Sequence, residues 1–181
     1  MHYILPKRNI RSSLVRGLIS EFIGTLFLSA TIAVVINIPT TNSPALTIGM
    51  MLLTQVFAYG YIGGGMFNPA VTTGVYMTMY RRAAVAGDPQ GRKHFMKWIV
   101  TLAVQFVGAL AGANLSAGII GPNGRDNFGA PMAAPGVSLR RSFAAELLFT
   151  CSLVSVMLNT AMARRYESSP NSFYGIGIGM S

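Results

Sequence analysis

Charged residues are scarce in this chain of 181 residues. Asp, Glu, Lys and Arg make up 10% of it and hydrophobic residues 51%, whereas soluble domains carry about 25% charged residues. So few charges cannot cover a water-facing surface, which excludes an ordinary soluble domain. The apolar residues fall in blocks of about 20, the length that spans a bilayer core as a helix. The composition therefore predicts an all-α, multi-pass membrane protein.

Acidic residues, histidine and cysteine are scarcer still, at five, two and one. The single Cys151 excludes a disulfide within the chain, and its apolar surroundings favour a small buried hydrophobe over a reactive thiol. No nucleophile–base pair or metal-ligand cluster appears, and His2 and His94 lie in expected terminal and loop positions. We therefore expect neither an enzyme nor a metal or other cofactor.

The net charge of +9 does not indicate a nucleic-acid partner. The cations lie between the apolar blocks rather than on one amphipathic face, and no aromatic–basic recognition motif accompanies them. Four of them, Lys7, Arg8, Arg11 and Arg16, precede the first apolar block. No small-residue cleavage site closes that block early, which predicts a retained first helix rather than a removed signal peptide.

Four long spans are expected, together with one short apolar piece and the start of a fifth block. Polar or Gly/Pro-rich stretches separate them, including a basic loop expected over Arg81–Lys93. The expected spans are Gly17–Ile38, Ala45–Tyr61, Phe95–Ile120 and Ser142–Ala163, the short piece is Asn68–Tyr80, and the fifth block is Asn171–Ser181.

The short piece Asn68–Tyr80 is expected to be a re-entrant half-helix. Its thirteen residues would reach only about 20 Å as a helix, and Gly63-Gly64-Gly65 breaks the chain before it. Non-helical backbone at membrane depth is tolerated where protein buries it or where it lines a wet cavity. The sequence therefore predicts a loop that enters the membrane and leaves on the same side.

The distribution of Lys and Arg supports re-entry. If Asn68–Tyr80 returns to its starting side, eleven cations fall on one side of the membrane and three on the other; a full span would give nine and five. The positive-inside rule then places the N-terminus in the cytoplasm, although it does not identify the membrane.

An internal repeat relates the two ends of the chain. Arg16, Glu21, Thr25 and Leu28 recur as Arg141, Glu146, Thr150 and Leu153 at one offset of 125, and Ile48-Gly49-Met50 recurs as Ile178-Gly179-Met180 at an offset of 130. Three spans separate the two starts, so the copies run in opposite directions, as in inverted-repeat channels and transporters. We expect one domain over residues 1–181, with a first repeat at about 14–121 and a partial second repeat at about 140–181. The counterpart of Asn68 then falls beyond Ser181.

The turn Asn68-Pro69-Ala70 has the chemistry of a pore element. Asn is a favoured N-cap and Pro fits the first helical position. Capping uses the side-chain oxygen and leaves the amide NH₂ as a donor, beside a helix terminus that carries about half a positive charge. Such a site repels cations while offering a hydrogen bond to a neutral molecule. Carbonyl groups of Gly63–Phe67 would form a row of acceptors beside it.

Three segments together resemble the aquaporin, or major intrinsic protein, family in order and spacing, over about Arg16–Ser181. They are Glu21-Phe22-Ile23-Gly24-Thr25, Gly65-Met66-Phe67-Asn68-Pro69-Ala70-Val71-Thr72 and Gln105-Phe106-Val107-Gly108-Ala109. The resemblance implies six spans, two half-helices, a pore in each subunit of a homotetramer, and passage of water or small uncharged solutes such as glycerol.

The resemblance also implies roles for individual residues. Asn68, Pro69 and Ala70 match the first signature turn, and Glu21 and Glu146 match the glutamates that hold the re-entrant loops through backbone N–H groups. Ile48 matches a member of the outer selectivity constriction, with packing against lipid or protein as its alternative. The expected pore wall further includes Gly64, Gly65, Met66 and Phe67, and Gln105 is expected to satisfy backbone or a neighbouring helix.

Departures from the family pattern bear on selectivity and on activity. Met66 replaces a frequent His, and Ile48 replaces a frequent aromatic, which favours a wider constriction that passes glycerol beside water. The second Asn-Pro-Ala turn and its following Arg are not in the sequence. The alternative function is therefore a truncated, non-conducting subunit that assembles with or regulates a full-length channel. An ion-coupled transporter is disfavoured, because only Glu21 and Glu146 qualify as intramembrane acids and both have structural explanations.

Overall fold

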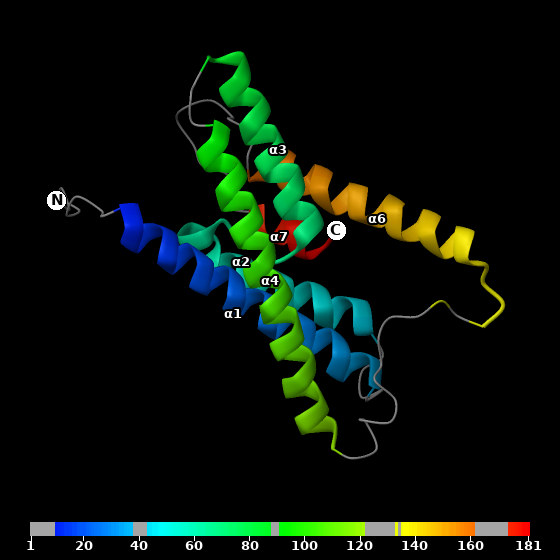
Figure 1. Ribbon diagram of the computed structural model, residues 1–181. Helices are drawn as coiled ribbons and strands as arrows, with labels where there is room; N and C mark the ends of the chain where they lie inside the picture. Colours follow the sequence, from blue (N-terminus) through cyan, green and yellow to red (C-terminus); the bar gives the residue numbers. More distant parts are fainter. Residues whose placement is uncertain (1–9, 38–42, 88–90, 122–132, 134, 162–173) are drawn as a thin grey trace.

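The computed structural model describes residues 10–37, 43–87, 91–121, 133, 135–161 and 174–181. These residues form helices without strands, and the helices cross one another at wide angles (Figure 1). In chain order they are α1 (Ile10–Asn37), α2 (Pro44–Gly63), α3 (Pro69–Val85), α4 (Gly91–Ile120), α6 (Leu139–Thr160) and α7 (Tyr174–Gly179). Within the described ranges, α1, α2, α4 and α6 are long and apolar enough to cross a membrane.

Most expected elements are present, with shifted ends. The largest difference is the basic loop expected over Arg81–Lys93, which is wrong at both ends: α3 continues to Val85 and α4 begins at Gly91. The reason is that Arg and Ala favour helix, and neither Gly nor Pro occurs between Arg81 and Gly87. His94 consequently lies in a helix rather than in a loop.

The ends of the other elements differ less. α1 begins before the expected Gly17, and α6 begins before the expected Ser142. Several cations used to orient the chain, namely Lys7, Arg8, Arg125, Arg164 and Arg165, lie outside the described residues, as does the expected end of the fourth span at Ala163.

Small residues set the packing of α1 on α4. A Cβ atom at Gly108 would lie 2.8 Å from the carbonyl oxygen of Phe22, and one at Gly112 would overlap the carbonyl oxygen of Leu26. In a bilayer, where lipid tails are as apolar as leucine, such small-residue contacts let helix backbones approach closely. Gly108 and Gly112 are four residues apart, so both lie on the face of α4 that meets α1.

The register of α3 against α4 shows the re-entry directly. Thr72 contacts Gln105, and the next residue of α3, Thr73, accepts a 3.2 Å hydrogen bond from Trp98 Nε1. As α3 runs forward, its contacts move toward the N-terminus of α4. α1 and α4 run in the same direction along the chain, since Phe22 contacts Gly108 and Leu26 contacts Gly112. α3 therefore leaves on the side where α1 and α4 begin, which is the side where α2 ends.

Two glycines meet where α2 crosses α7. A Cβ atom at Gly179 would lie 2.7 Å from the Gly49 carbonyl oxygen, and one at Gly49 would overlap the Gly179 carbonyl oxygen. The contact is reciprocal, and the two glycines are the equivalent positions of the repeated Ile-Gly-Met sequences. Reciprocal contact of equivalent residues is what a two-fold axis between two copies produces.

α6 extends away from the other helices over its N-terminal half (Figure 1). Leu139 and Phe143 are 82% and 68% exposed, whereas Met157, near the other end of α6, is 3% exposed and belongs to the core. Around Met157 the core contains Val56 of α2, Val71 and Val75 of α3, and Ile178 of α7. The half-helix α3 thus packs between α4 and α6.

Gly112→Ala should destabilise the protein by about 1–3 kcal/mol, the usual cost of overfilling a packed contact, because the new Cβ atom would overlap the Leu26 carbonyl. Gly118→Ala, on the same helix with open space at its Cβ, should be neutral or slightly stabilising. Unfolding of the two variants by SDS titration in mild detergent, followed by circular dichroism, compares them. Equal stability would mean that α1 and α4 do not meet at Gly112.

Candidate functional site

The turn between α2 and α3 is built on three residues with positive φ. Gly64 ends α2 at φ 112° and its N–H donates to the Gly60 carbonyl at 3.0 Å. Gly65 follows at φ 67°, and Phe67 at φ 46°. Glycine adopts this region without steric cost, but Phe67 does not, so the surrounding structure must hold it there.

The ring of Phe67 is held against α1. Phe67 is 2% exposed, and a Cβ atom at Gly24 would overlap its ring. Only glycine at position 24 leaves room for this ring. The contact of the Phe67 ring with the backbone of α1 at Gly24 therefore holds Phe67 in its left-handed conformation. This conformation in turn sets the position of the next residue, Asn68.

Asn68 caps α3. Its Oδ1 atom accepts a 2.8 Å hydrogen bond from the Ala70 N–H, its carbonyl accepts a 2.9 Å bond from the Thr72 N–H, and Pro69 occupies the first turn. Among the described residues, the Asn68 Nδ2 group donates to no partner. The half-helix thus presents an amide donor at its positive end.

Glu21 holds the turn inside the apolar layer. Its side chain is 1% exposed; Oε1 accepts a 3.0 Å hydrogen bond from the Met66 N–H and Oε2 a 2.8 Å bond from the Phe67 N–H. Glu21 lies eight residues inside the apolar span Ser13–Asn37, or about 12 Å along the helix. Two backbone donors that no helix satisfies are thereby paired at that depth.

Gln105 extends this network to α4. Its Nε2 atom donates to Glu21 Oε2 at 2.9 Å and lies 2.7 Å from Thr72 Oγ1, whose hydroxyl lies 3.0 Å from Gln105 Oε1. Gln105 and Thr72 are both fully buried. α1, the turn, α3 and α4 are therefore joined by one buried polar network.

Thr72 was not among the residues expected at the site. One feature of the sequence could have indicated its role: Thr72 is a polar residue one helical turn after the capping Asn68, within an apolar half-helix. Its partner Gln105 was expected to satisfy backbone or a neighbouring helix, and it contacts side chains of α1 and α3.

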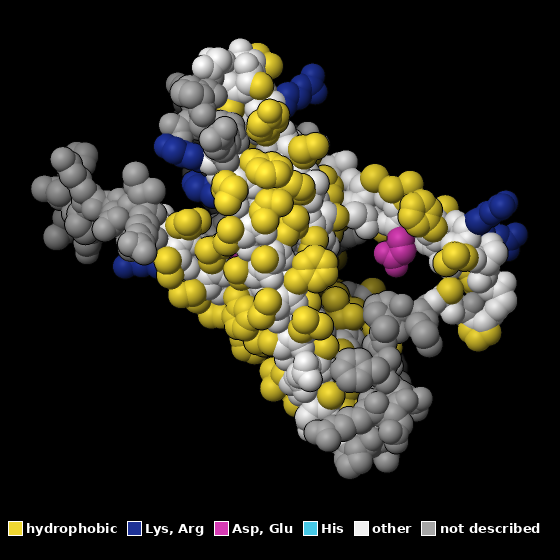
Figure 2. Space-filling model, viewed as in Figure 1, with side chains coloured by type: hydrophobic (Ala, Val, Ile, Leu, Met, Phe, Trp, Pro, Cys, Tyr) yellow, Lys and Arg dark blue, Asp and Glu magenta, His cyan; other side chains and the backbone are white. Residues whose placement is uncertain are grey.

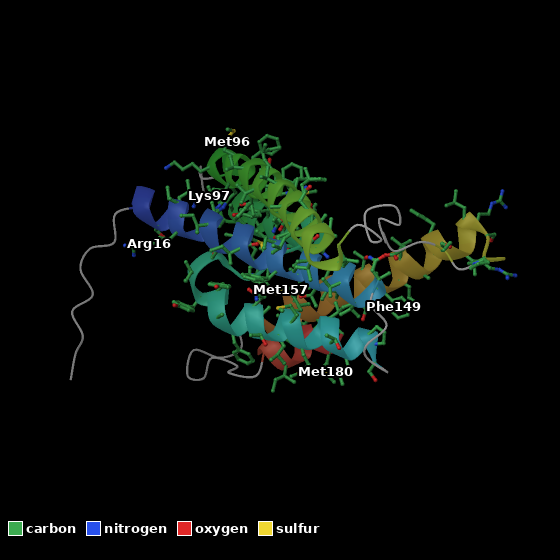
Figure 3. All side chains as sticks on the ribbon, turned by 90° about the horizontal axis from the view of Figure 1, so that it is seen from below. Arg16, Met96, Lys97, Phe149, Met157 and Met180 are labelled. Carbon is green, nitrogen blue, oxygen red and sulfur yellow. The ribbon has the colours of Figure 1, made fainter. Side chains whose placement is uncertain are left out.

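Of the remaining predicted residues, Ile48 and Glu146 are not brought to the turn, and the Met66 side chain packs away from it. Ile48 is half-buried on α2, and Glu146 is exposed on α6 with no hydrogen bond to another described residue. Glu146 is the only acidic residue of α6, and Figure 2 shows acidic atoms exposed on that helix. Met66 is 5% exposed and packs in the core with Val56 and Ile178 rather than facing open space. Figure 3 shows Phe149 on the extended part of α6, while Met157 lies among the other helices.

The described residues contain no cluster of metal-ligating side chains. No three His, Cys, Asp or Glu side chains come together there, and the buried polar network consists of a carboxylate, an amide and a hydroxyl. These groups bind backbone and one another, so what the network does is fix the position of a helix terminus.

Four apolar helices and a buried, capped half-helix define a class: a multi-pass membrane protein with a re-entrant loop. Comparison with known proteins then gives the family. Residues 9–181 match the sequence model of the major intrinsic protein family. The chain belongs to the major intrinsic protein family and has its all-α, aquaporin-like fold.

Individual relatives agree. The chain is 25% identical over 175 residues to Aquaporin A of Dictyostelium discoideum, covering 92% of the chain and 58% of the relative. It is 30% identical over 161 residues to Aquaporin PIP-type of Atriplex canescens (83% and 53%). It is 29% identical over 175 residues to the lens fiber major intrinsic protein of Lithobates pipiens (92% and 60%). The chain thus spans a little over half the length of these relatives.

Glu21→Gln should destabilise the 181-residue chain by about 1–3 kcal/mol, because one amide oxygen cannot replace two carboxylate oxygens and a buried N–H loses its acceptor. Glu146→Gln is the matched control and should be neutral, since Glu146 is exposed. SDS-titrated unfolding in mild detergent measures both. A Glu21→Gln protein as stable as the control would show that the carboxylate does not hold the turn.

Proposed function

We propose that the chain is the pore-forming part of a passive membrane channel for water and small uncharged solutes. The observation that carries the proposal is the donor-bearing N-terminus of α3, held about 12 Å inside the apolar layer by Glu21. The relatives named as aquaporins support the same function.

The selectivity mechanism follows from electrostatics. The N-terminus of α3 carries about half a positive charge, and the Asn68 amide adds a donor. A cation approaching this point loses hydration and meets a positive potential, whereas a neutral molecule such as water loses hydration but gains a hydrogen bond. The backbone of Gly64–Phe67 would supply acceptors for the same molecule. The proposed pore therefore passes neutral hydroxylic molecules.

The arrangement in the membrane is part of the proposal. The described cations Arg16, Arg81, Lys93 and Lys97 lie at the ends of α1, α3 and α4 that share one side, and positive-inside places that side in the cytoplasm. The reciprocal contact of Gly49 with Gly179 supports an inverted repeat over about 14–121 and 140–181. We further propose homotetramers, in keeping with the family resemblance.

A second candidate follows from the exposed part of α6. No described residue buries the side chains of Leu139, Phe143 and Glu146 on this helix. In this second proposal another channel subunit packs against them, and the chain assembles with that subunit or regulates it. Osmotic swelling separates the candidates. Clear swelling of proteoliposomes of the 181-residue chain, compared with empty vesicles, favours the first, whereas a change in the swelling of vesicles that contain another, conducting channel subunit when the chain is added favours the second.

Asn68→Asp should reduce swelling of proteoliposomes that contain the full-length protein several-fold. Asp caps a helix as well as Asn does, so the fold should persist, while the amide donor is replaced by a charge in the pore. Asn114→Asp, at an exposed position of α4, is the control. Unchanged swelling of the Asn68→Asp protein at equal protein content would show that Asn68 does not line the pore.

Ile48→Phe should slow swelling driven by glycerol influx more than water-driven swelling, because an aromatic ring narrows the proposed outer constriction. Stopped-flow light scattering in sucrose and in glycerol gradients measures the two fluxes on the full-length protein. If the ratio of the two fluxes does not change, Ile48 does not line the constriction and its half-buried position reflects packing alone.

A further inference from the structure

A cavity separate from the Asn68 turn opens between α1, the end of α2, α3 and α4. Its volume is about 260 Å³, and α1 contributes one continuous face to it: Ser13, Leu14, Gly17, Leu18 and Glu21. Lys97 and Thr101 of α4 lie opposite. Neither the proposed pore nor the hydrogen-bond network uses this space, apart from the Glu21 side chain at one end.

The cavity extends from a polar mouth at the membrane boundary to the buried side chain of Glu21. Ser13 is the first residue of the apolar span and Glu21 lies eight residues further along α1, so the cavity reaches about 12 Å inward. Lys97 at the mouth is exposed. Glu21 at the floor is 1% exposed, and its oxygens already accept hydrogen bonds from Met66, Phe67 and Gln105. The accessible charge of the cavity is therefore the positive charge of Lys97.

Further cations lie at the same end of the molecule as Lys97. Figure 3 shows Arg16 of α1 and Lys97 of α4 at the same end of the molecule, and Figure 2 shows Lys and Arg atoms gathered there. Arg81, Arg82 and Lys93 are also exposed, and none of these five side chains forms an ion pair with another described residue. This end of the molecule is thus positive, and no carboxylate of the described residues pairs with these cations.

Apolar and aromatic side chains accompany these charges. Leu14, Leu18 and Ile62 line the cavity. Near Lys97, the rings of Phe95 and Trp98 lie with centroids 5.5 Å apart. Trp is enriched at membrane–water interfaces, so this level of α4 fits the headgroup region. The combination of Lys97 at the rim, hydroxyl groups and leucine side chains matches an amphiphile that carries a phosphate.

We propose that this cavity binds the headgroup of an anionic phospholipid of the surrounding bilayer. Lys97 attracts the phosphate, the Ser13 hydroxyl lies at the level of the glycerol, and Leu14, Leu18 and Ile62 contact the first methylene groups of an acyl chain. Basic pockets between transmembrane helices bind anionic headgroups in this way. Because Glu21 and Gly63 also line the cavity, the bound lipid lies against the helix face that holds the re-entrant turn.

The test measures lipid binding to the purified 181-residue chain in neutral detergent, by native mass spectrometry and by the thermal shift on lipid titration. The probes are dioctanoyl phosphatidylglycerol, dioctanoyl phosphatidylcholine and soluble glycerol 3-phosphate. We expect the anionic lipid to bind at least fivefold more tightly than either of the others. Lys97→Gln should weaken its binding about fivefold, the effect of one basic residue near an anionic surface, and Lys97→Arg should preserve it.

Two further variants distinguish the cavity from general attraction of anions. Arg140→Gln removes the same charge from the exposed part of α6 and should leave lipid affinity unchanged. Leu18→Trp fills the cavity without changing net charge and should weaken binding. An equal loss of lipid affinity in the Arg140→Gln and Lys97→Gln proteins, or unchanged lipid affinity in the Leu18→Trp protein, would overturn the proposal. Equally tight binding of glycerol 3-phosphate would show an anion site without a role for lipid.

Discussion

The structure depends on the carboxylate of Glu21, which accepts hydrogen bonds from the backbone N–H groups of Met66 and Phe67. A backbone N–H group without a partner in hydrocarbon costs several kcal/mol, and for that reason irregular backbone is rare at this depth. Glu21 supplies two acceptor oxygens on a rigid helix at the place where α2 has ended and α3 has not begun. Without that acceptor, a turn inside the apolar layer would leave two donors unpaired.

The other features of the site follow from this attachment. The left-handed backbone of Phe67 is sustained because its N–H is bound on one side and its ring is packed at Gly24 on the other. Gln105 donates a further hydrogen bond to Glu21 and also binds Thr72, so α4 is aligned with the half-helix. The cap at Asn68 is then left with an amide donor directed by a fixed backbone, and the proposed passage of neutral molecules depends on this donor.

Features encoded over short stretches could be predicted from the sequence: the long apolar spans, the Gly break after Gly63, the capping of α3 by Asn68, and re-entry. The end of α3 could not, because helix propensity in Arg81–Val85 outweighed the expectation that charges mark a loop. The Gly24–Phe67 and Thr72–Gln105 contacts depend on helix crossings that spacing alone does not reveal. Glu146 differs from Glu21 for a related reason: the two share a sequence pattern, but only Glu21 has a re-entrant backbone beside it among the described residues.

Backbone amide hydrogen–deuterium exchange at Met66 and Phe67 tests the central claim most directly. Both residues lie outside helices, so a solvated turn would exchange their amides as fast as an unstructured peptide does. Attachment to Glu21 predicts strong protection of these two amides in the wild-type chain in detergent or nanodiscs, and loss of that protection in Glu21→Gln while α1 and α4 amides stay protected. Rapid exchange at Met66 and Phe67 in the wild-type chain would contradict the account.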